Sequence, residues 1–161
     1  YDPQAAMAAH AAGVGAEMTV PLGGKFVEFS EPLVLTVVVE ALSEGRFRFT
    51  GPMFGGSDAD LGKVARLHVK GTGVRVVVGS QRAQNADQEM FRVVGIEPKD
   101  HAIVCVKSAV HFMADYKRVA RHILFAVAPG ANPCALETIP FSRVRPGLRL
   151  GPGGPVTGLQ T

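Results

Sequence analysis

The chain has 161 residues, of which 47% are hydrophobic and 19% charged, so it can bury one core and is not a disordered chain. Its 19 glycines and 11 prolines favour turns and loops over a helical bundle. The net charge of +3 comes from scattered basic residues with no aromatic motif for stacking bases, which argues against a nucleic-acid binder. No apolar run reaches the ~20 residues of a membrane span.

The first half of the sequence predicts one helix followed by hairpins. Asp2 suits an N-cap, Pro3 suits the first turn, and the alanine-rich residues that follow favour helix over residues 3–12. Strands are expected over residues 17–20, 33–42, 46–50, 65–70 and 74–78. Short turns join 33–42 to 46–50 and 65–70 to 74–78, so each pair predicts a hairpin. The valine-rich strand 33–42 is expected to be largely covered on both faces.

The second half predicts helices that alternate with apolar strands. A short helix is expected over residues 87–94, and a longer one over 109–121 with Ser108 as its N-cap. The apolar runs 102–106 and 123–127 favour buried strands, which would make Cys105 a buried thiol. Beyond Phe141 the glycine- and proline-rich sequence predicts loops.

Together these elements predict an α+β (mixed α/β) fold, in which a mixed sheet is built from hairpins and strand–helix units and helices pack on it. We expect one domain over residues 1–150, incomplete at its N-terminal edge, and a flexible tail over 151–161. Two lone cysteines and the lack of a visible signal peptide predict a cytoplasmic location.

No metal or nucleotide motif is complete in the sequence. The pair Gly24-Lys25 lacks the first glycine and the Ser/Thr of a phosphate-binding loop. The start of a calcium loop at Asp58 and Asp60 fails because Val69 stands where the bidentate Glu is required. No histidine or cysteine has a second ligand at zinc-site spacing. We therefore expect no metal ligand and no cofactor in this chain.

The segment 106–112 places Lys107, Ser108 and His111 where a strand is expected to end and a helix to begin. A cation, a hydroxyl and a titratable ring beside a helix N-terminus are typical of a site for an anion or a substrate. The competing interpretation is a helix cap, with Ser108 as the N-cap and His111 at the third position of a capping box. A serine and a histidine without an acid partner do not form a triad.

The polar run 80–87 follows an expected strand and carries Arg82, Gln84 and Asp87. These side chains can contact a ligand, or they can belong to a solvated loop that caps the next helix, and the sequence leaves both interpretations open. Gln84 and Asp87 therefore join Lys107, Ser108 and His111 as candidate substrate-binding residues. No catalytic residue can be named.

At these two segments the sequence resembles the C-terminal domain of MlrC-like proteins, a family named for a microcystin-degrading metallopeptidase. The matching stretches run in order along nearly the whole chain, and the core Lys107-Ser108 with His111-Phe112 is the most specific of them. The others are Asp2-Pro3, residues 13–16, residues 22–25, Gly45, Phe47, residues 51–53, residues 80–87, Phe91-Arg92, residues 95–98, Pro129-Gly130 and Arg145-Pro146.

The resemblance implies a two-domain protein whose larger N-terminal domain holds the catalytic metal. That metal is expected to be zinc. This chain would then be an accessory domain that shapes the pocket for a peptide-like or amide substrate. Its expected partners are the N-terminal domain and, in an oligomer, further copies of itself. Neither nucleic acid nor a membrane is expected as a partner. The alternative is a non-catalytic ligand-binding or oligomerisation module.

Overall fold

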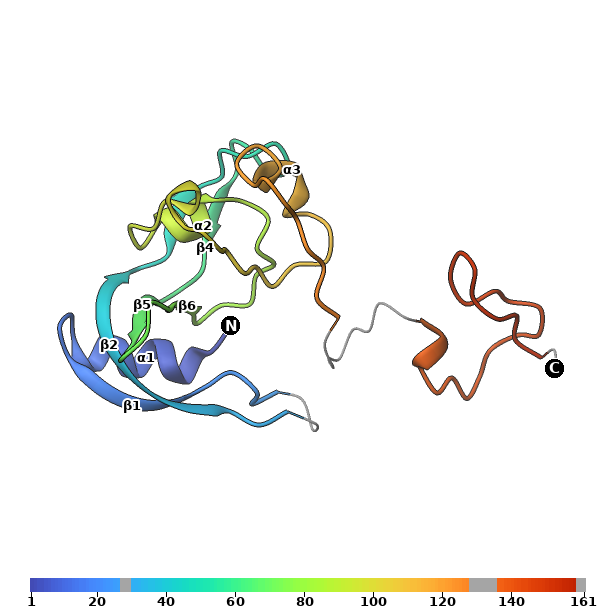
Figure 1. The fold of residues 1–161 in the computed structure, drawn as a ribbon, viewed down its shortest axis with the longest axis horizontal. Helices are drawn as coiled ribbons and strands as arrows, with labels where there is room; N and C mark the ends of the chain where they lie inside the picture. The colour runs from blue at the N-terminus through green and yellow to red at the C-terminus, as the bar shows by residue number, and fades with distance from the viewer. Residues whose placement is uncertain (27–29, 128–135, 159–161) are drawn as a thin grey trace. The chain divides into compact units, whose positions relative to one another are not determined.

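A computed structural model describes residues 1–26, 30–127 and 136–158 of the chain. It divides into two compact units, residues 1–26 with 31–123, and residues 27–30 with 124–161. The first unit contains every α-helix and named strand of the described residues, and the candidate site lies within it (Figure 1).

Helix α1 (Pro3–Ala12) covers one face of a four-stranded sheet (Figure 1). It begins where expected, because Oδ1 of Asp2 accepts a hydrogen bond from the backbone N–H of Ala5 at 3.0 Å. Its buried face consists of alanines, which let the helix backbone approach the sheet closely. The core beneath it contains Ala5, Ala6, Ala9, Val20, Leu22, Val37, Val39, Ala65, Leu67 and Val78.

The sheet has the strand order β1-β2-β5-β6, and every pairing in it is antiparallel. Its strands are β1 (Glu17–Leu22), β2 (Leu33–Ser43), β5 (Val64–Val69) and β6 (Arg75–Gly79). The predicted hairpin of the last two strands is confirmed. On the face away from α1, Glu40 forms ion pairs with Arg66 at 3.1 Å and Arg75 at 2.7 Å.

Two expectations for the strand over residues 33–42 are wrong. It forms no hairpin with the next strand, because both edges of β2 are already occupied by β1 and β5. Strand β3 (Arg46–Arg48) pairs instead with β4 (Asp58–Asp60) in a separate two-stranded sheet. Nor are both faces of β2 covered along its length: Val37 and Val39 are buried, but Leu33 and Val34 are about two-thirds exposed.

A second apolar cluster joins the small sheet to the chain that follows β6. It contains Leu61, Val64, Met90, Val94 and Ile96, with Phe47, Phe49 and Phe91 partly buried against them. Helix α2 (Glu89–Arg92) and the 3-10 turn η1 (Pro98–Asp100) belong to this part of the chain. The short helix expected over residues 87–94 exists, but it is shorter than expected and covers only the middle of that range.

Three further expectations after residue 100 are wrong. Residues 102–106 and 123–127 form no strand, because a strand needs a hydrogen-bonded neighbour and none of the described strands pairs with either run. Cys105 is correspondingly exposed. The helix expected over 109–121 is reduced to α3 (Met113–Tyr116), so Ser108 lies well before it and does not cap it.

The second unit contains the 3-10 turn η2 (Leu136–Thr138) and an isolated antiparallel bridge between Arg149 and Val156. Cys134 lies outside the described residues. The α+β class is confirmed, with a four-stranded sheet, a second small sheet and few helices. Across the described ranges, no helix is long and apolar enough to cross a bilayer.

Candidate functional site

Gln84 brings two of the other predicted site residues together. Its side-chain Nε2 donates a hydrogen bond to Oγ of Ser108 at 3.0 Å, and its Oε1 lies 2.6 Å from Nδ1 of His111. Gln84 comes from the loop after β6, whereas Ser108 and His111 precede α3. The loop 80–87 and the segment 106–112 therefore meet in space, as the substrate-site interpretation requires.

The site is accessible to solvent. Gln84 is exposed, and Ser108 and His111 are half-buried. The ring of Phe54 packs edge-to-face on the His111 imidazole, with centroids 6.5 Å apart and an interplanar angle of 74°. The imidazole is thus held by an aromatic edge and an amide oxygen while the site remains accessible.

Lys107 and Arg82 are both exposed and contribute positive charge to the two segments. The Arg82 guanidinium lies over the ring of Tyr1, 5.1 Å from its centroid. The sequence predicts that the dipole of a long helix attracts an anion to this segment. That contribution is missing, because α3 has only four residues and begins at Met113. Any attraction for an anion must come from these side chains themselves.

Asp87 is placed differently from the other candidates, since only 1% of its surface is exposed. Its Oδ2 accepts hydrogen bonds from the backbone N–H groups of Thr50 at 3.1 Å and Gly51 at 2.7 Å. Its Oδ1 accepts another from the backbone N–H of Glu89 at 2.9 Å. The carboxylate therefore connects the turn after β3 to α2 and supports the loop that carries Gln84.

A second contact, which the sequence did not indicate, fixes the segment after His111 to the same loop. The hydroxyl of Tyr116 donates to Oδ1 of Asn85 at 2.9 Å, and Oδ2 of Asp115 accepts from the backbone N–H of Gln88 at 2.9 Å. Burial raises the pKa of the Tyr116 phenol above its ordinary value, although the bond to Asn85 opposes the shift. In the sequence these residues had the pattern of an ordinary helix.

A buried ion pair between Asp2 and Lys25 was also missed, although both residues belong to stretches that carry the family resemblance. Lys25 Nζ lies 2.8 and 2.7 Å from the two carboxylate oxygens, and the backbone N–H of Gly23 donates to Asp2 at 3.0 Å. Burial by itself raises the pKa of Asp2, but Lys25 and the backbone N–H groups outweigh it and hold the pKa below its ordinary value. The pair ties the start of α1 to the turn after β1.

Three of the other histidines have a ring nitrogen within hydrogen-bond distance of a backbone carbonyl oxygen. Ring nitrogens of His10, His68 and His101 lie 3.1, 2.7 and 3.1 Å from the carbonyl oxygens of Val64, Thr72 and Glu97. Within residues 1–26, 30–127 and 136–158, no three side chains of His, Cys, Asp or Glu converge as metal ligands.

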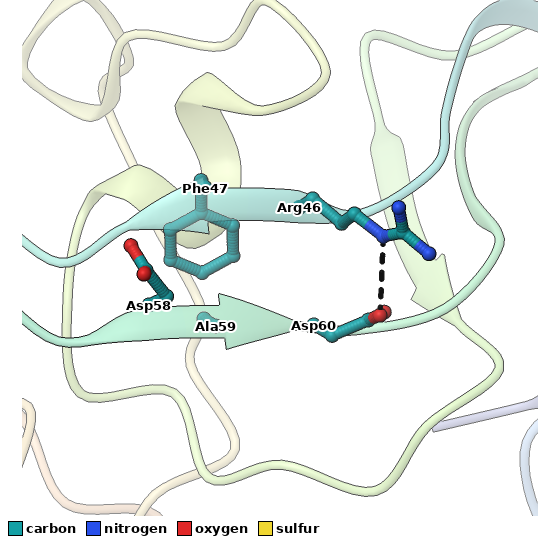
Figure 2. Close-up of a pocket in the computed structure, with 5 residues that line it drawn as sticks. All are labelled: Arg46, Phe47, Asp58, Ala59 and Asp60. Atoms are coloured by element: carbon teal, nitrogen blue, oxygen red, sulfur yellow. Dashed lines mark hydrogen bonds and ion pairs between the residues drawn. The ribbon is translucent and has the colours of Figure 1, made fainter.

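A hollow of about 560 Å³ lies on β3 and β4, lined by Arg46, Phe47, Asp58, Ala59 and Asp60 (Figure 2). Both aspartates are paired across the strands, Asp60 with Arg46 at 3.4 Å and Asp58 with Arg48 at 2.9 Å. The side chains that form these pairs are all more than half exposed. We regard this open surface as a less suitable site than the Gln84–Ser108–His111 network, whose polar groups are fixed by contacts between distant segments.

Comparison with known proteins identifies the family. Residues 1–143 match the family described as "MlrC C-terminus". The chain belongs to this family. It is 28% identical over 129 residues to Microcystinase C of Sphingomonas sp., a match that covers 80% of this chain and 24% of that protein.

The MlrC C-terminal fold is also found in a solved structure. The crystal structure of the "Putative metallopeptidase from Mesorhizobium sp. BNC1" superposes on this chain with a TM-score of 0.80 and 30% sequence identity. The match covers 91% of this chain and 29% of that one. The chain thus spans about a quarter of the length of Microcystinase C and less than a third of the Mesorhizobium protein.

Proposed function

We propose that this MlrC C-terminal domain is the accessory domain of a metal-dependent peptidase or amidohydrolase, and that it shapes the substrate pocket against a metal-bearing N-terminal domain. The family match and the name of the Mesorhizobium protein support the reaction class. Most of the length of both relatives lies outside the matched region, which leaves room for the second domain. The observation that carries the proposal is the solvent-facing network of Gln84, Ser108 and His111.

The described residues do not fit the zinc ion that we propose for the other domain. His111 is one imidazole where a zinc site needs three or four ligands, and the carboxylate of Asp87 already accepts three backbone hydrogen bonds. No group of three metal-ligating side chains is present in the described ranges. We therefore assign substrate binding, and no metal-dependent step, to Lys107, Ser108, His111 and Gln84, with Asp87 as their support.

Exposed apolar side chains support a further protein partner. Ile103 is 82% exposed in the first unit, and Leu124 and Val127 are 91% and 82% exposed in the second. Within the second unit, Leu124 and Val127 belong to one short run of exposed apolar residues, the kind of surface that a partner covers. We propose the N-terminal domain as the partner, with further copies of the chain as the alternative. The match to residues 1–143 supports a domain within residues 1–150. We further propose the flexible tail over 151–161 that the glycine- and proline-rich sequence predicts. A cytoplasmic location stays a prediction.

The test is kinetic and uses a full-length MlrC-like protein that carries this domain. His111→Ala and Lys107→Ala are compared with His122→Ala and Lys117→Ala, which remove the same side chains from exposed positions that the proposal does not use. We expect kcat/KM on short peptide substrates to fall about tenfold or more for the first two variants and to stay unchanged for the controls. Melting temperatures measured on the same samples separate loss of binding from loss of fold.

Two results contradict the proposal. In the first, both site variants are folded and as active as their controls, so that the network is not part of the pocket. In the second, the 161-residue chain hydrolyses the peptides without any other domain, so that the catalytic centre lies within it.

A further inference from the structure

The hydrogen bonds of Gln84 determine which atoms of its two neighbours remain available. A carboxamide oxygen can only accept a hydrogen bond, and a carboxamide nitrogen can only donate one. Since Oε1 of Gln84 faces Nδ1 of His111 at 2.6 Å, the imidazole donates through Nδ1–H. Since Nε2 of Gln84 donates to Oγ of Ser108, the serine uses a lone pair there and keeps its own O–H.

The consequence for His111 is a fixed tautomer. With the proton on Nδ1, the neutral ring carries its lone pair on Nε2. No described residue is a hydrogen-bond partner of Nε2, and the edge contact with Phe54 restrains the ring. The network therefore leaves one acceptor, Nε2 of His111, and one donor, the hydroxyl of Ser108, that Gln84 does not use.

The loop that carries Gln84 is itself anchored at two neighbouring residues. Oδ1 of Asn85 accepts a hydrogen bond from the Tyr116 hydroxyl. The side chain of Asp87, which is only 1% exposed, accepts three backbone hydrogen bonds. The donor and the acceptor are thus set in place before any ligand arrives, which lowers the cost of binding.

An amide group offers a carbonyl oxygen and an N–H on opposite sides, which are the partners that a hydroxyl donor and an imidazole acceptor require. We infer that Gln84 is a positioning residue that sets the His111 tautomer, and that Ser108 and His111 recognise an amide of the substrate. The carbonyl oxygen accepts from the Ser108 hydroxyl, and the amide N–H donates to Nε2 of His111. This assignment rests on the proposed function only in taking the substrate to be peptide-like.

The tautomer is measured by NMR of the ring nitrogens in the 15N-histidine-labelled 161-residue chain, with His111→Ala used to assign the signals. The wild type is expected to show the Nδ1–H form. In Gln84→Leu the acceptor is lost and the more common Nε2–H form should replace it, whereas Gln84→Glu keeps an acceptor and should keep the Nδ1–H form. A wild-type ring in the Nε2–H form, or a Gln84→Leu ring that stays in the Nδ1–H form, overturns the positioning role.

The ligand class is measured by titrating the same chain with N-methylacetamide and with methyl acetate, which lacks the N–H. The amide should shift the Nε2 signal of His111, and the ester should not; in Gln84→Leu the amide effect should disappear. Equal shifts by both compounds, or no shift by the amide, overturn the amide assignment. Neither measurement involves catalysis, so failure here is distinguishable from failure of the proposed function, which the kinetic comparison of His111→Ala with His122→Ala tests separately.

Discussion

Replacing Asp87 with alanine should destabilise the domain far more than removing an exposed carboxylate. The Asp87 side chain accepts hydrogen bonds from the backbone N–H groups of Thr50, Gly51 and Glu89, at 2.7–3.1 Å. Gly51 is buried, so water cannot replace the lost acceptor there, whereas Thr50 and Glu89 are more accessible. The variant therefore leaves one backbone donor without a partner and forces two others to find solvent.

The size of the effect follows from these three bonds. A hydrogen bond to a charged group contributes about 1.5–3 kcal/mol, which we assign to the buried Gly51 donor. The lost hydrogen bond of each of the two more accessible donors lowers the free energy of unfolding by about 0.5–1.5 kcal/mol. The loss for Asp87→Ala then centres on about 4 kcal/mol, which lowers the melting temperature of a chain of this size by roughly 8–16 °C. Asp87→Asn keeps one acceptor oxygen and should lose about half as much, because its NH₂ group then faces another donor.

Urea and thermal unfolding of the 161-residue chain, followed by circular dichroism, measure these differences. Asp58→Ala is the matched control, because Asp58 is exposed and its ion pair is with the exposed Arg48 on the neighbouring strand. It should melt close to the wild type. If Asp87→Ala falls within about 1 kcal/mol of the wild type, or if Asn destabilises more than Ala, the carboxylate does not hold these segments as argued.

Two further predictions concern the Asp2–Lys25 pair and the exposed apolar residues. Asp2→Asn should cost about 3 kcal/mol at pH 7, because it breaks a buried ion pair, although asparagine can still cap α1. Since the folded-state pKa of Asp2 is depressed, its contribution is present above the unfolded value of about 3.9 and is lost as pH falls through the folded value. Urea unfolding from pH 7 to pH 3 should therefore show the gap between wild type and variant closing, and a gap that stays constant contradicts the argument. Ile103→Lys should change the stability of the 161-residue chain by no more than about 0.5 kcal/mol, since this side chain is 82% exposed. In a full-length MlrC-like protein the same change should make the domain easier to release by limited proteolysis, and an unchanged proteolysis rate removes Ile103 from the interface.

Local signals were sufficient for α1, its cap and one hairpin. The cap at Asp2, the helix over Pro3–Ala12 and the hairpin of β5 and β6 depend on contacts between residues close in sequence, so their patterns identify them. The pairing of β2 was not a local matter. Its short turn to β3 predicts a hairpin, but β1 and β5 compete for the same edges and bury Val37 and Val39 under α1.

The apolar runs 102–106 and 123–127 show why composition is insufficient for strands. Valine and isoleucine favour an extended chain, but a strand exists only where a neighbour accepts its hydrogen bonds. None of the described strands pairs with either run, and Ile103 is exposed where the sequence predicts burial. The sequence also could not tell that the helix after Ser108 would be only four residues long, because the length of a helix depends on its tertiary packing more than on propensity.

From the sequence we could identify the loop 80–87 and the segment 106–112 as the two polar candidates and see their resemblance to the MlrC family. The three-dimensional contacts were needed to show that Gln84 bridges Ser108 and His111, that Asp87 is buried and that Ser108 does not cap α3. Gln84 and His111 are 27 residues apart in the chain. Their contact depends on how α2, α3 and the buried Asp87 and Tyr116 pack together, and no local pattern contains that information.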